Sequence, residues 1–196
     1  MGKTMKEIVC EKIFGMDYQR LKEQLDPLRA EGKTVVMCSG TFDLCHPGHM
    51  NMINAAKDHG DILVVAVKSK RAAAKKKLFP PVISEEDRLY AVANMMAVDY
   101  VIMVDFEPFR PVHFILDNTS SHEWLNMFEP AVSVIRPDIF VHEENPEIVH
   151  ARAQLFEKYD IKGVIQQRTK GVSTTQIIDT IKTQVLIENQ RLLQGK

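Results

Sequence analysis

The chain has 196 residues, of which 45% are hydrophobic and 26% charged, and its formal net charge is -1. This length and composition predict one globular domain with a sizeable core. The near-zero charge argues against a globally basic nucleic-acid binder and against attraction to an anionic membrane surface. No apolar stretch approaches the roughly 18 residues that a membrane-spanning helix needs.

The first residues and the cysteines indicate a cytoplasmic location. The stretch "MGKTMKEIVCEKIF" is charged throughout and lacks the apolar centre of a signal peptide. The three cysteines, Cys10, Cys38 and Cys45, are odd in number and show no CxxC spacing, which is typical of free thiols in a reducing compartment. We therefore expect a cytoplasmic protein.

Hydrophobic periodicity and turn residues define the expected elements. In chain order they are a helix over 17–31, a strand over 34–40, a helix over 47–59, a strand over 61–67, a basic loop over 68–81, a helix that begins after Ser84, strands over 99–104 and 138–142, a helix over 146–159, a strand over 161–165 and a helix over 174–193. Pro27 lies inside the first helical pattern and is expected to kink or shorten it. Gly60 is the expected C-cap of the second helix.

Short apolar strands that alternate with helices predict an α/β fold. We expect a single domain with a Rossmann-like, doubly wound parallel sheet of about five strands. Ligands bind such sheets beyond the carboxyl ends of the strands. Three loops fall there: 40–49, 68–81 and 167–175.

The first of these loops, "GTFDLCHPGH", offers two imidazoles at the start of a helix. Pro47 suits the first helical position, with His46 as N-cap. Gly48 lets an oxygen-rich ligand approach the backbone, and the free N–H groups of the first turn favour an anion. His46 and His49 beside them can stabilise a phosphate on which charge develops. A packed histidine pair and a metal pair with Cys45 are the alternatives.

The other two loops supply cations and hydroxyls. In "RTKGVSTT" (168–175), Arg168 has a forked donor face that suits phosphate oxygens, Gly171 permits a close approach, and Ser173 and Thr174 supply hydroxyls where the last helix begins. A plain capped helix is the alternative for this segment. The basic loop "KSKRAAAKKK" (68–77) also has an alternative, a solvated run of charge.

Two of these segments carry a family resemblance. "GTFDLCHPGH" resembles the GxFDxxHxGH signature of the cytidylyltransferase-like nucleotidyltransferases, and "RTKGVSTT" resembles the RTxGxSTT signature of the cytidylyltransferase branch. "PVISEEDR" (81–88) is similar to a PVxxxExR stretch of the heptose-phosphate branch, and the lead-in "LRAEGKTVV" is similar to that branch too. The resemblance covers about residues 33–185.

The resemblance implies transfer of a nucleoside monophosphate from a nucleoside triphosphate to a phosphorylated alcohol or sugar, with release of pyrophosphate. It also implies Mg²⁺ carried mainly by the triphosphate and no metal site made by the protein. The implied catalytic residues are His46, His49, Lys76 and Arg168, and the implied nucleotide- or phosphate-binding residues are Gly40, Thr41, Phe42, Asp43, Gly48, Arg88, Thr169, Gly171, Ser173 and Thr174.

The choice of nucleotide is divided between two branches. "RTKGVSTT" favours CTP, which we prefer, whereas the lead-in and "PVISEEDR" favour ATP and a heptose phosphate. Synthesis of a flavin adenylate is a further enzymatic alternative, and a nucleotide- or nucleic-acid-binding module without catalysis is the alternative from another class. "HEEN" (142–145) departs from the Gly-Asp-Asp-Trp or Gly-Gly-Asp-Tyr element of many relatives. Acceptor identity therefore stays open.

The resemblance also frames the chain's organisation. We expect residues 1–32 to form an N-terminal helical extension and 33–196 to form the nucleotidyltransferase domain, with an insert at about 106–135. Packing is the expected role of His113, His122 and Trp124 in that insert, with a lid or acceptor-specific segment as the alternative. We expect no nucleic-acid partner. Relatives are often homodimers, and Ile177, Ile181 and Val185 on the final helix could serve a dimer face, although a core role is the preferred prediction.

Overall fold

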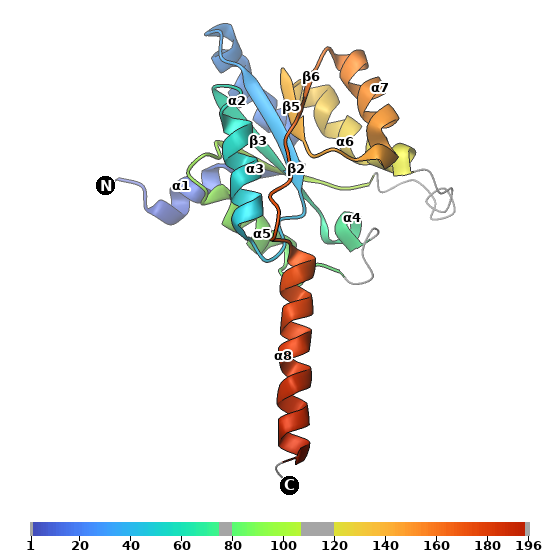
Figure 1. The fold of residues 1–196 in the computed structure, drawn as a ribbon. Helices are drawn as coiled ribbons and strands as arrows, with labels where there is room; N and C mark the ends of the chain where they lie inside the picture. The colour runs from blue at the N-terminus through green and yellow to red at the C-terminus, as the bar shows by residue number, and fades with distance from the viewer. Residues whose placement is uncertain (1, 75–79, 107–119, 195–196) are drawn as a thin grey trace.

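The computed structural model describes residues 2–74, 80–106 and 120–194 (Figure 1). Its sheet has six strands in the order β1-β4-β3-β2-β5-β6, and every neighbouring pair runs parallel. The strands are β1 (Ile13–Gly15), β2 (Val35–Gly40), β3 (Ile62–Lys68), β4 (Tyr100–Val104), β5 (Ile139–His142) and β6 (Lys162–Ile165). The predicted Rossmann-like α/β fold is confirmed, with one strand more than the expected number.

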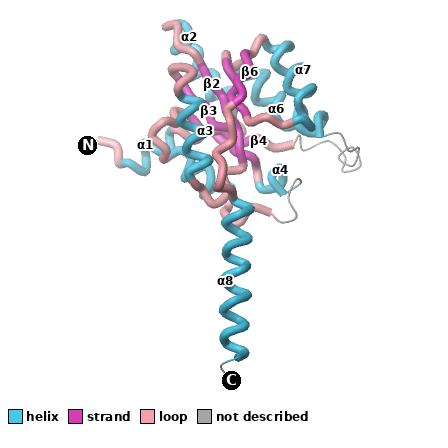
Figure 2. Tube along the Cα trace, viewed as in Figure 1, coloured by secondary structure: helices cyan, strands magenta, loops and turns pink. Residues whose placement is uncertain are grey.

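Helices lie on both sides of this sheet (Figure 2). They are α1 (Met5–Glu11), α2 (Tyr18–Ala30), α3 (Pro47–Lys57), α4 (Lys70–Ala74), α5 (Glu85–Ala93), α6 (Ser120–Ile135), α7 (Val149–Tyr159) and α8 (Thr174–Gln194), with a single 3-10 turn, η2 (Pro146–Ile148), before α7. Ser84 caps α5 as predicted, because its hydroxyl accepts from the Asp87 N–H at 3.1 Å. Pro27 is accommodated within α2, which continues to Ala30.

Two separate hydrophobic cores fill the two faces of the sheet. Strand side chains alternate between them, so Met37 points into one core and its neighbour Cys38 into the other. On one face α2, α6 and α7 cover the strands, and we call these residues the α6 core. On the other face α1, α3 and α5 cover them, and we call these residues the α3 core. The central strand β3 is buried over Ile62–Val67 because it is covered on both faces.

The chain changes direction of winding at the boundary between β2 and β5. The path from β2 to β3 runs through α3 on one face, whereas the path from β4 to β5 runs through α6 on the other. Yet β2 pairs with both β3 and β5. Loops leaving these two strands therefore diverge to opposite faces, and such a topological switch point opens a crevice beyond the carboxyl ends.

The N-terminal segment is part of the sheet and is not wholly helical. The helix predicted over 17–31 is present as α2, and α1 precedes it, but Ile13–Gly15 between them forms β1 and pairs with β4. A strand of three residues is too short for its hydrophobic alternation to be recognised in the sequence, so β1 was not predicted. Its pairing with β4 at the edge of the sheet defines it as a strand.

Two local predictions are wrong. Gly60 is not the C-cap of α3, which ends at Lys57 with Asp58 as C-cap. Gly60 is instead needed for packing, because a Cβ there would lie 2.6 Å from Val36 Cγ2. The loop predicted over 68–81 contains the short helix α4, whose Ala72 and Ala73 are buried. The loop was predicted from its run of basic residues, which does not show that this alanine pair is buried. Burial of the two alanines accounts for the helix.

The insert at 106–135 contributes to the α6 core. Trp124, Met127 and Phe128 on α6 are buried, and Trp124 packs against the rings of Phe128 and Phe140 at centroid distances of 4.7 and 6.1 Å. The packing role predicted for Trp124 is confirmed. His113 lies outside the described residues, and the described part of His122 is its backbone alone.

The final helix α8 projects away from the body of the protein (Figures 1 and 2). Ile181 and Val185 are 50% and 53% exposed, so the predicted core role of this helix is wrong. Periodic apolar residues predict a helix face but do not say what covers it. Across the described ranges, no helix is long and apolar enough to cross a bilayer.

Candidate active site

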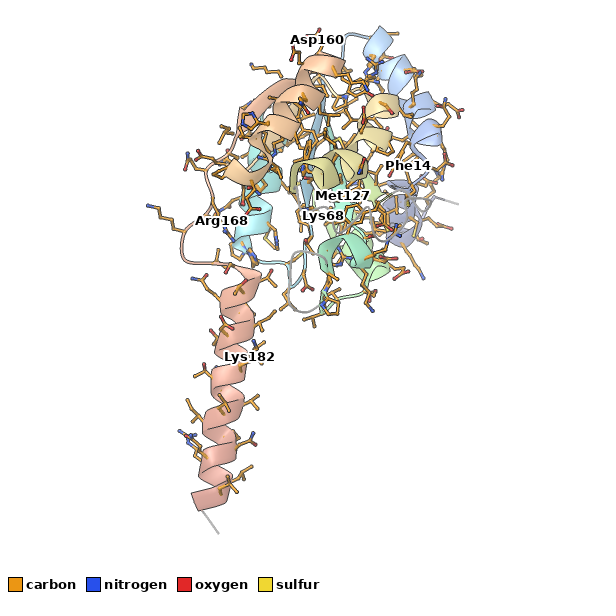
Figure 3. All side chains as sticks on the ribbon, turned by 90° about the vertical axis from the view of Figure 1, so that its right-hand side faces the viewer. Phe14, Lys68, Met127, Asp160, Arg168 and Lys182 are labelled. Carbon is orange, nitrogen blue, oxygen red and sulfur yellow. The ribbon has the colours of Figure 1, made fainter. Side chains whose placement is uncertain are left out.

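One cavity of about 470 Å³ lies beyond the carboxyl ends of the strands. Most of the residues predicted for the site line it: Gly40, Thr41, Phe42, His46, Gly48, His49, Arg168, Thr169, Ser173 and Thr174. Figure 3 labels Arg168 on the loop that leads into α8, and it also labels Lys68 and Met127, which line other parts of the cavity. Segments more than a hundred residues apart thus share one cavity.

The two imidazoles of the first motif are stacked. The ring centroids of His46 and His49 are 3.9 Å apart, with an angle of 25° between the planes. His46 is the N-cap residue of α3, as predicted, and Pro47 occupies the first turn. A Cβ on Gly48 would lie 3.0 Å from the His46 ring, so glycine at this position makes room for the stacked pair.

Phe42 supports this pair from the α3 core. It is 2% exposed, and its ring centroid lies 5.3 Å from that of His49. Its backbone has φ +54°, a left-handed conformation that is uncommon for a bulky residue and costs of order 1–3 kcal/mol. A Cβ on Gly40 would lie 2.9 Å from the Phe42 ring, so the glycine before the turn lets the ring fold under the loop. Phe42 and Gly40 therefore position His49.

Asp43 and Arg88 lie behind the cavity wall rather than in it. The Asp43 carboxylate accepts from the backbone N–H groups of Val82 and Ile83, both at 3.0 Å. The fully buried Arg88 donates through Nη1 to the carbonyls of Thr41 and Lys68 at 2.6 and 2.7 Å. Burial lowers the pKa of the Arg88 guanidinium, and the Asp43 charge partly opposes this shift. The pair joins the loops that follow β2 and β3.

The second motif is tied to the first by hydrogen bonds. The Thr174 hydroxyl donates to the Asp43 carbonyl at 2.8 Å, and the Asn51 side chain donates to the Thr169 hydroxyl at 3.2 Å. Ser173 also caps α8, because its hydroxyl accepts from the Gln176 N–H at 3.1 Å. Gly171 has φ +79°, so glycine serves the turn, and this residue does not line the cavity. These bonds present the exposed Arg168 at the cavity mouth.

The opposite wall contains residues that no motif indicated. Phe106, Trp124 and Met127 form an apolar part of it beside Arg152. His142 of the "HEEN" segment lies there too, and Asn145 of the same segment accepts from the Glu147 N–H at 3.0 Å to start η2. A lone arginine in a predicted helix is usually solvent-exposed, so the sequence carries no signal that places Arg152 at a site.

Among the described residues, Arg152 is held through one of its three side-chain nitrogens. Nη1 donates to the Glu143 carbonyl at 2.7 Å and lies 2.9 Å from His142 Nδ1, which itself lies 3.0 Å from that carbonyl. The guanidinium carbon lies 5.7 Å from the centre of the Trp124 ring. Burial lowers the pKa of Arg152 to about 10, partly opposed by Glu143, so the group stays charged at neutral pH. Burial also lowers the pKa of His142, and the Arg152 charge acts in the same direction, whereas the contact with the Glu143 carbonyl opposes the shift.

Two predicted features are not placed by the described residues. Lys76 lies outside them, as do residues 107–119 of the insert. In the ranges that the structure describes, no group of three His, Cys, Asp or Glu side chains gathers closely enough to hold a metal ion. The oxygen donors of the cavity wall, Glu143 and Glu144 among them, suit a Mg²⁺ that keeps most of its waters better than a closed protein cage.

Comparison with known proteins places the chain in a family. It matches the family model described as cytidylyltransferase-like over residues 37–180. The bifunctional protein HldE of Syntrophotalea carbinolica is 31% identical over 166 residues, which cover 83% of this chain and 30% of that protein. The HldE protein of Yersinia enterocolitica is 33% identical over 180 residues, which cover 88% of this chain and 33% of that protein.

The chain therefore spans about a third of the length of these curated relatives. Among solved structures, a pantoate-beta-alanine ligase from Francisella tularensis aligns with a TM-score of 0.54 at 14% identity, covering 87% of this chain and 76% of that one, which shows a common fold alone. The match over residues 37–180 coincides with the two motif loops that meet in the cavity, and the chain belongs to the cytidylyltransferase-like family.

Proposed function

We propose that this chain transfers a nucleoside monophosphate from a nucleoside triphosphate to a phosphorylated alcohol or sugar and releases pyrophosphate. The observation that carries the proposal is the stacked His46–His49 pair at the start of α3, in one cavity with Arg168 and the hydroxyls of the second motif. Family membership supports the same reaction class.

The reaction needs no nucleophile from the protein. An oxygen of the acceptor phosphate attacks the α-phosphorus in line, a new P–O bond forms, and the bond from the α-phosphorus to the bridging oxygen breaks with its electron pair leaving on pyrophosphate. Catalysis then consists of positioning and charge stabilisation. Mg²⁺ bound to the triphosphate would neutralise part of the phosphate charge.

Different residues of the cavity would carry out the positioning and the charge stabilisation. N–H groups of the stacked His46 and His49 imidazoles would donate hydrogen bonds to the α-phosphate and stabilise the charge that develops there. Arg168, Ser173 and Thr174 would hold the β- and γ-phosphates that leave. Lys76 remains a proposed aid at the α-phosphate.

The nucleotide is the finer part of the proposal. The motif "RTKGVSTT" favours CTP, but it is eight residues long. The similarity to HldE proteins runs over 166–180 residues and supports the adenylyl alternative that the sequence left open. We therefore place ATP ahead of CTP, with a sugar phosphate as the first acceptor to try.

A grid of pyrophosphate-release assays tests these statements. ATP and CTP are each combined with heptose 1-phosphate, glycerol 3-phosphate, phosphocholine and phosphoethanolamine. Turnover with ATP alone supports the adenylyl assignment, and turnover with CTP alone restores the cytidylyl one. Nucleotide binding without pyrophosphate release from any pair would favour a nucleotide-sensing module instead. A steep fall of nucleic-acid binding with salt would identify the remaining non-enzymatic alternative.

A further inference from the structure

Arg152 is a cation of the cavity wall whose bonds within the protein leave part of the guanidinium unused. It lines the cavity, and its side chain is half-buried. Its Nε atom is fully buried and has no hydrogen-bond partner. Among the described residues, no carboxylate forms an ion pair with it. A partly buried charge without an ion-pair partner is costly, and a bound anion would supply the opposite charge.

The protein contacts leave one edge of the guanidinium unused. Nη1 donates to the Glu143 carbonyl and lies beside His142 Nδ1, which fixes the plane of the group. Among the described residues, none accepts a hydrogen bond from Nε or Nη2, and of these two nitrogens only Nε is closed to solvent. Nη2 can therefore donate a charge-assisted hydrogen bond to an oxygen of a carboxylate or a phosphate. A nucleobase, which is neutral, would leave the charge uncompensated.

The triphosphate has its own cations on the other wall. His46 and His49 follow β2 and pack with the α3 core through Phe42, and Arg168 lies on the loop before α8. Arg152 instead comes from α7 and adjoins Trp124 of the α6 core. An anion at Arg152 therefore belongs to the other substrate. Exposed carboxylates of Glu143 and Glu144 lie near the mouth, but solvent screens them more than it screens the buried Nε.

We propose that Arg152 is a specificity-determining residue that binds a second anionic group of the acceptor, a carboxylate or a phosphate, separate from the phosphate that attacks. This inference rests on the proposed transfer reaction for the identity of the attacking phosphate. The acceptor spans the cavity from the histidine pair to the Arg152 edge, with its carbon skeleton against Phe106, Trp124 and Met127.

Trp124 provides a direct readout of binding at this place. It is the only tryptophan of the chain, and the Arg152 guanidinium lies 5.7 Å from the centre of its ring. Its fluorescence is titrated with three related compounds, with and without a non-hydrolysable triphosphate analogue. Glycerol 3-phosphate has one anion, 3-phosphoglycerate adds a carboxylate, and glycerol 1,3-bisphosphate adds a phosphate. The last two arms show which second group is preferred.

We expect the preferred second anion to lower Kd by about tenfold or more relative to glycerol 3-phosphate, as for a charge-assisted hydrogen bond. Arg152→Gln should reduce this preference to about twofold or less, and Arg152→Lys, which keeps the charge but not the guanidinium, should retain part of it. Lys158→Gln is the matched control, because it removes a charge from an exposed position on the same helix and should leave the preference unchanged.

Three results would overturn the inference: equal affinity of the wild-type protein for all three compounds, a preference that survives in Arg152→Gln, or tighter binding of phosphocholine than of any of them. If Arg152→Gln does not fold, a full preference in Arg152→Lys counts against a contact made by the guanidinium. Binding is read without turnover, so the two proposals fail separately. A preference for the second anion without any pyrophosphate release would leave the inference standing and remove the transfer reaction.

Discussion

The two walls of the cavity differ in how they are built. The wall with His46, His49 and Arg168 comes from two contiguous motifs that follow strand ends and are joined to each other by Thr174 and Asn51. The wall with Phe106, Trp124 and Arg152 collects single residues from a loop and two helices, with no motif among them. The first wall therefore carries the residues of the two signatures, whereas the second wall is made by packing alone.

The largest expected effect is a loss of turnover on substitution of His49, the residue of the first wall proposed to contact the reacting phosphate. His49→Ala should lower kcat by about 10²- to 10³-fold, the usual loss for one preorganised donor to a developing charge. Pyrophosphate release under saturating substrates measures it. Met50→Ala, at the next position of the same helix and 45% exposed, is the control and should be close to wild type. Near-normal turnover of His49→Ala would contradict the catalytic assignment.

Arg88, which lies behind the first wall, should affect the stability of the protein more than its turnover. Arg88→Met removes a fully buried guanidinium whose bonds join the carbonyls of Thr41, Lys68 and Ile83. Leaving those carbonyls unpaired should cost about 3 kcal/mol of unfolding free energy, measured by urea denaturation. Arg191→Met, exposed on α8, should change it by less than about 0.5 kcal/mol. Equal stability of the two variants would mean that Arg88 is not a structural tie.

The hydrogen bond between the two motifs is expected to contribute less to the free energy of unfolding than Arg88 does. Thr174→Val removes the hydroxyl that donates to the Asp43 carbonyl while keeping the side-chain shape. The expected loss is about 1 kcal/mol of unfolding free energy, together with a higher KM for the triphosphate. Thr180→Val is the matched control, because its hydroxyl bonds only within α8. A KM unchanged in Thr174→Val would show that the motifs keep their positions without this bond.

The smallest expected effect is a change in the pH dependence of stability, caused by His142 in the second wall. Burial lowers the pKa of His142 from its ordinary value near 6.5. The folded protein therefore takes up this proton less readily than the unfolded chain, and stability is lost as the pH falls below the unfolded pKa. His142→Gln should make unfolding free energy less dependent on pH between about pH 8 and pH 5. An identical pH dependence in the variant and the wild type would refute this.

The sequence predicted the first wall well and the second poorly, for a physical reason. The motif loops follow buried strands, and parallel strands bring their carboxyl ends together, so local pattern was enough to place His46 and Arg168 near each other. Trp124 and Arg152 approach each other only because α6 and α7 pack on the same face. Single residues brought together by packing have no spacing to recognise.

The same distinction applies to the fold. Long buried strands such as Ile62–Lys68 were predictable from composition, whereas β1 depends on pairing with β4 and has no pattern of its own. The apolar residues of α8 predicted a covered face, but the helix is exposed. The homodimer stays a prediction. Solution scattering that finds only a monomer at micromolar concentration would remove it.

The separation of the hydrophobic interior into the α6 core and the α3 core bears on how such a protein can diverge. The histidine pair is supported from the α3 core, and the Arg152 wall from the α6 core, with the sheet between them. Substitutions that repack one layer have little direct contact with the other, and distant sites combine almost independently. Substitutions in α6 and α7 can therefore reshape the Arg152 wall while the packing behind the histidine pair stays unchanged.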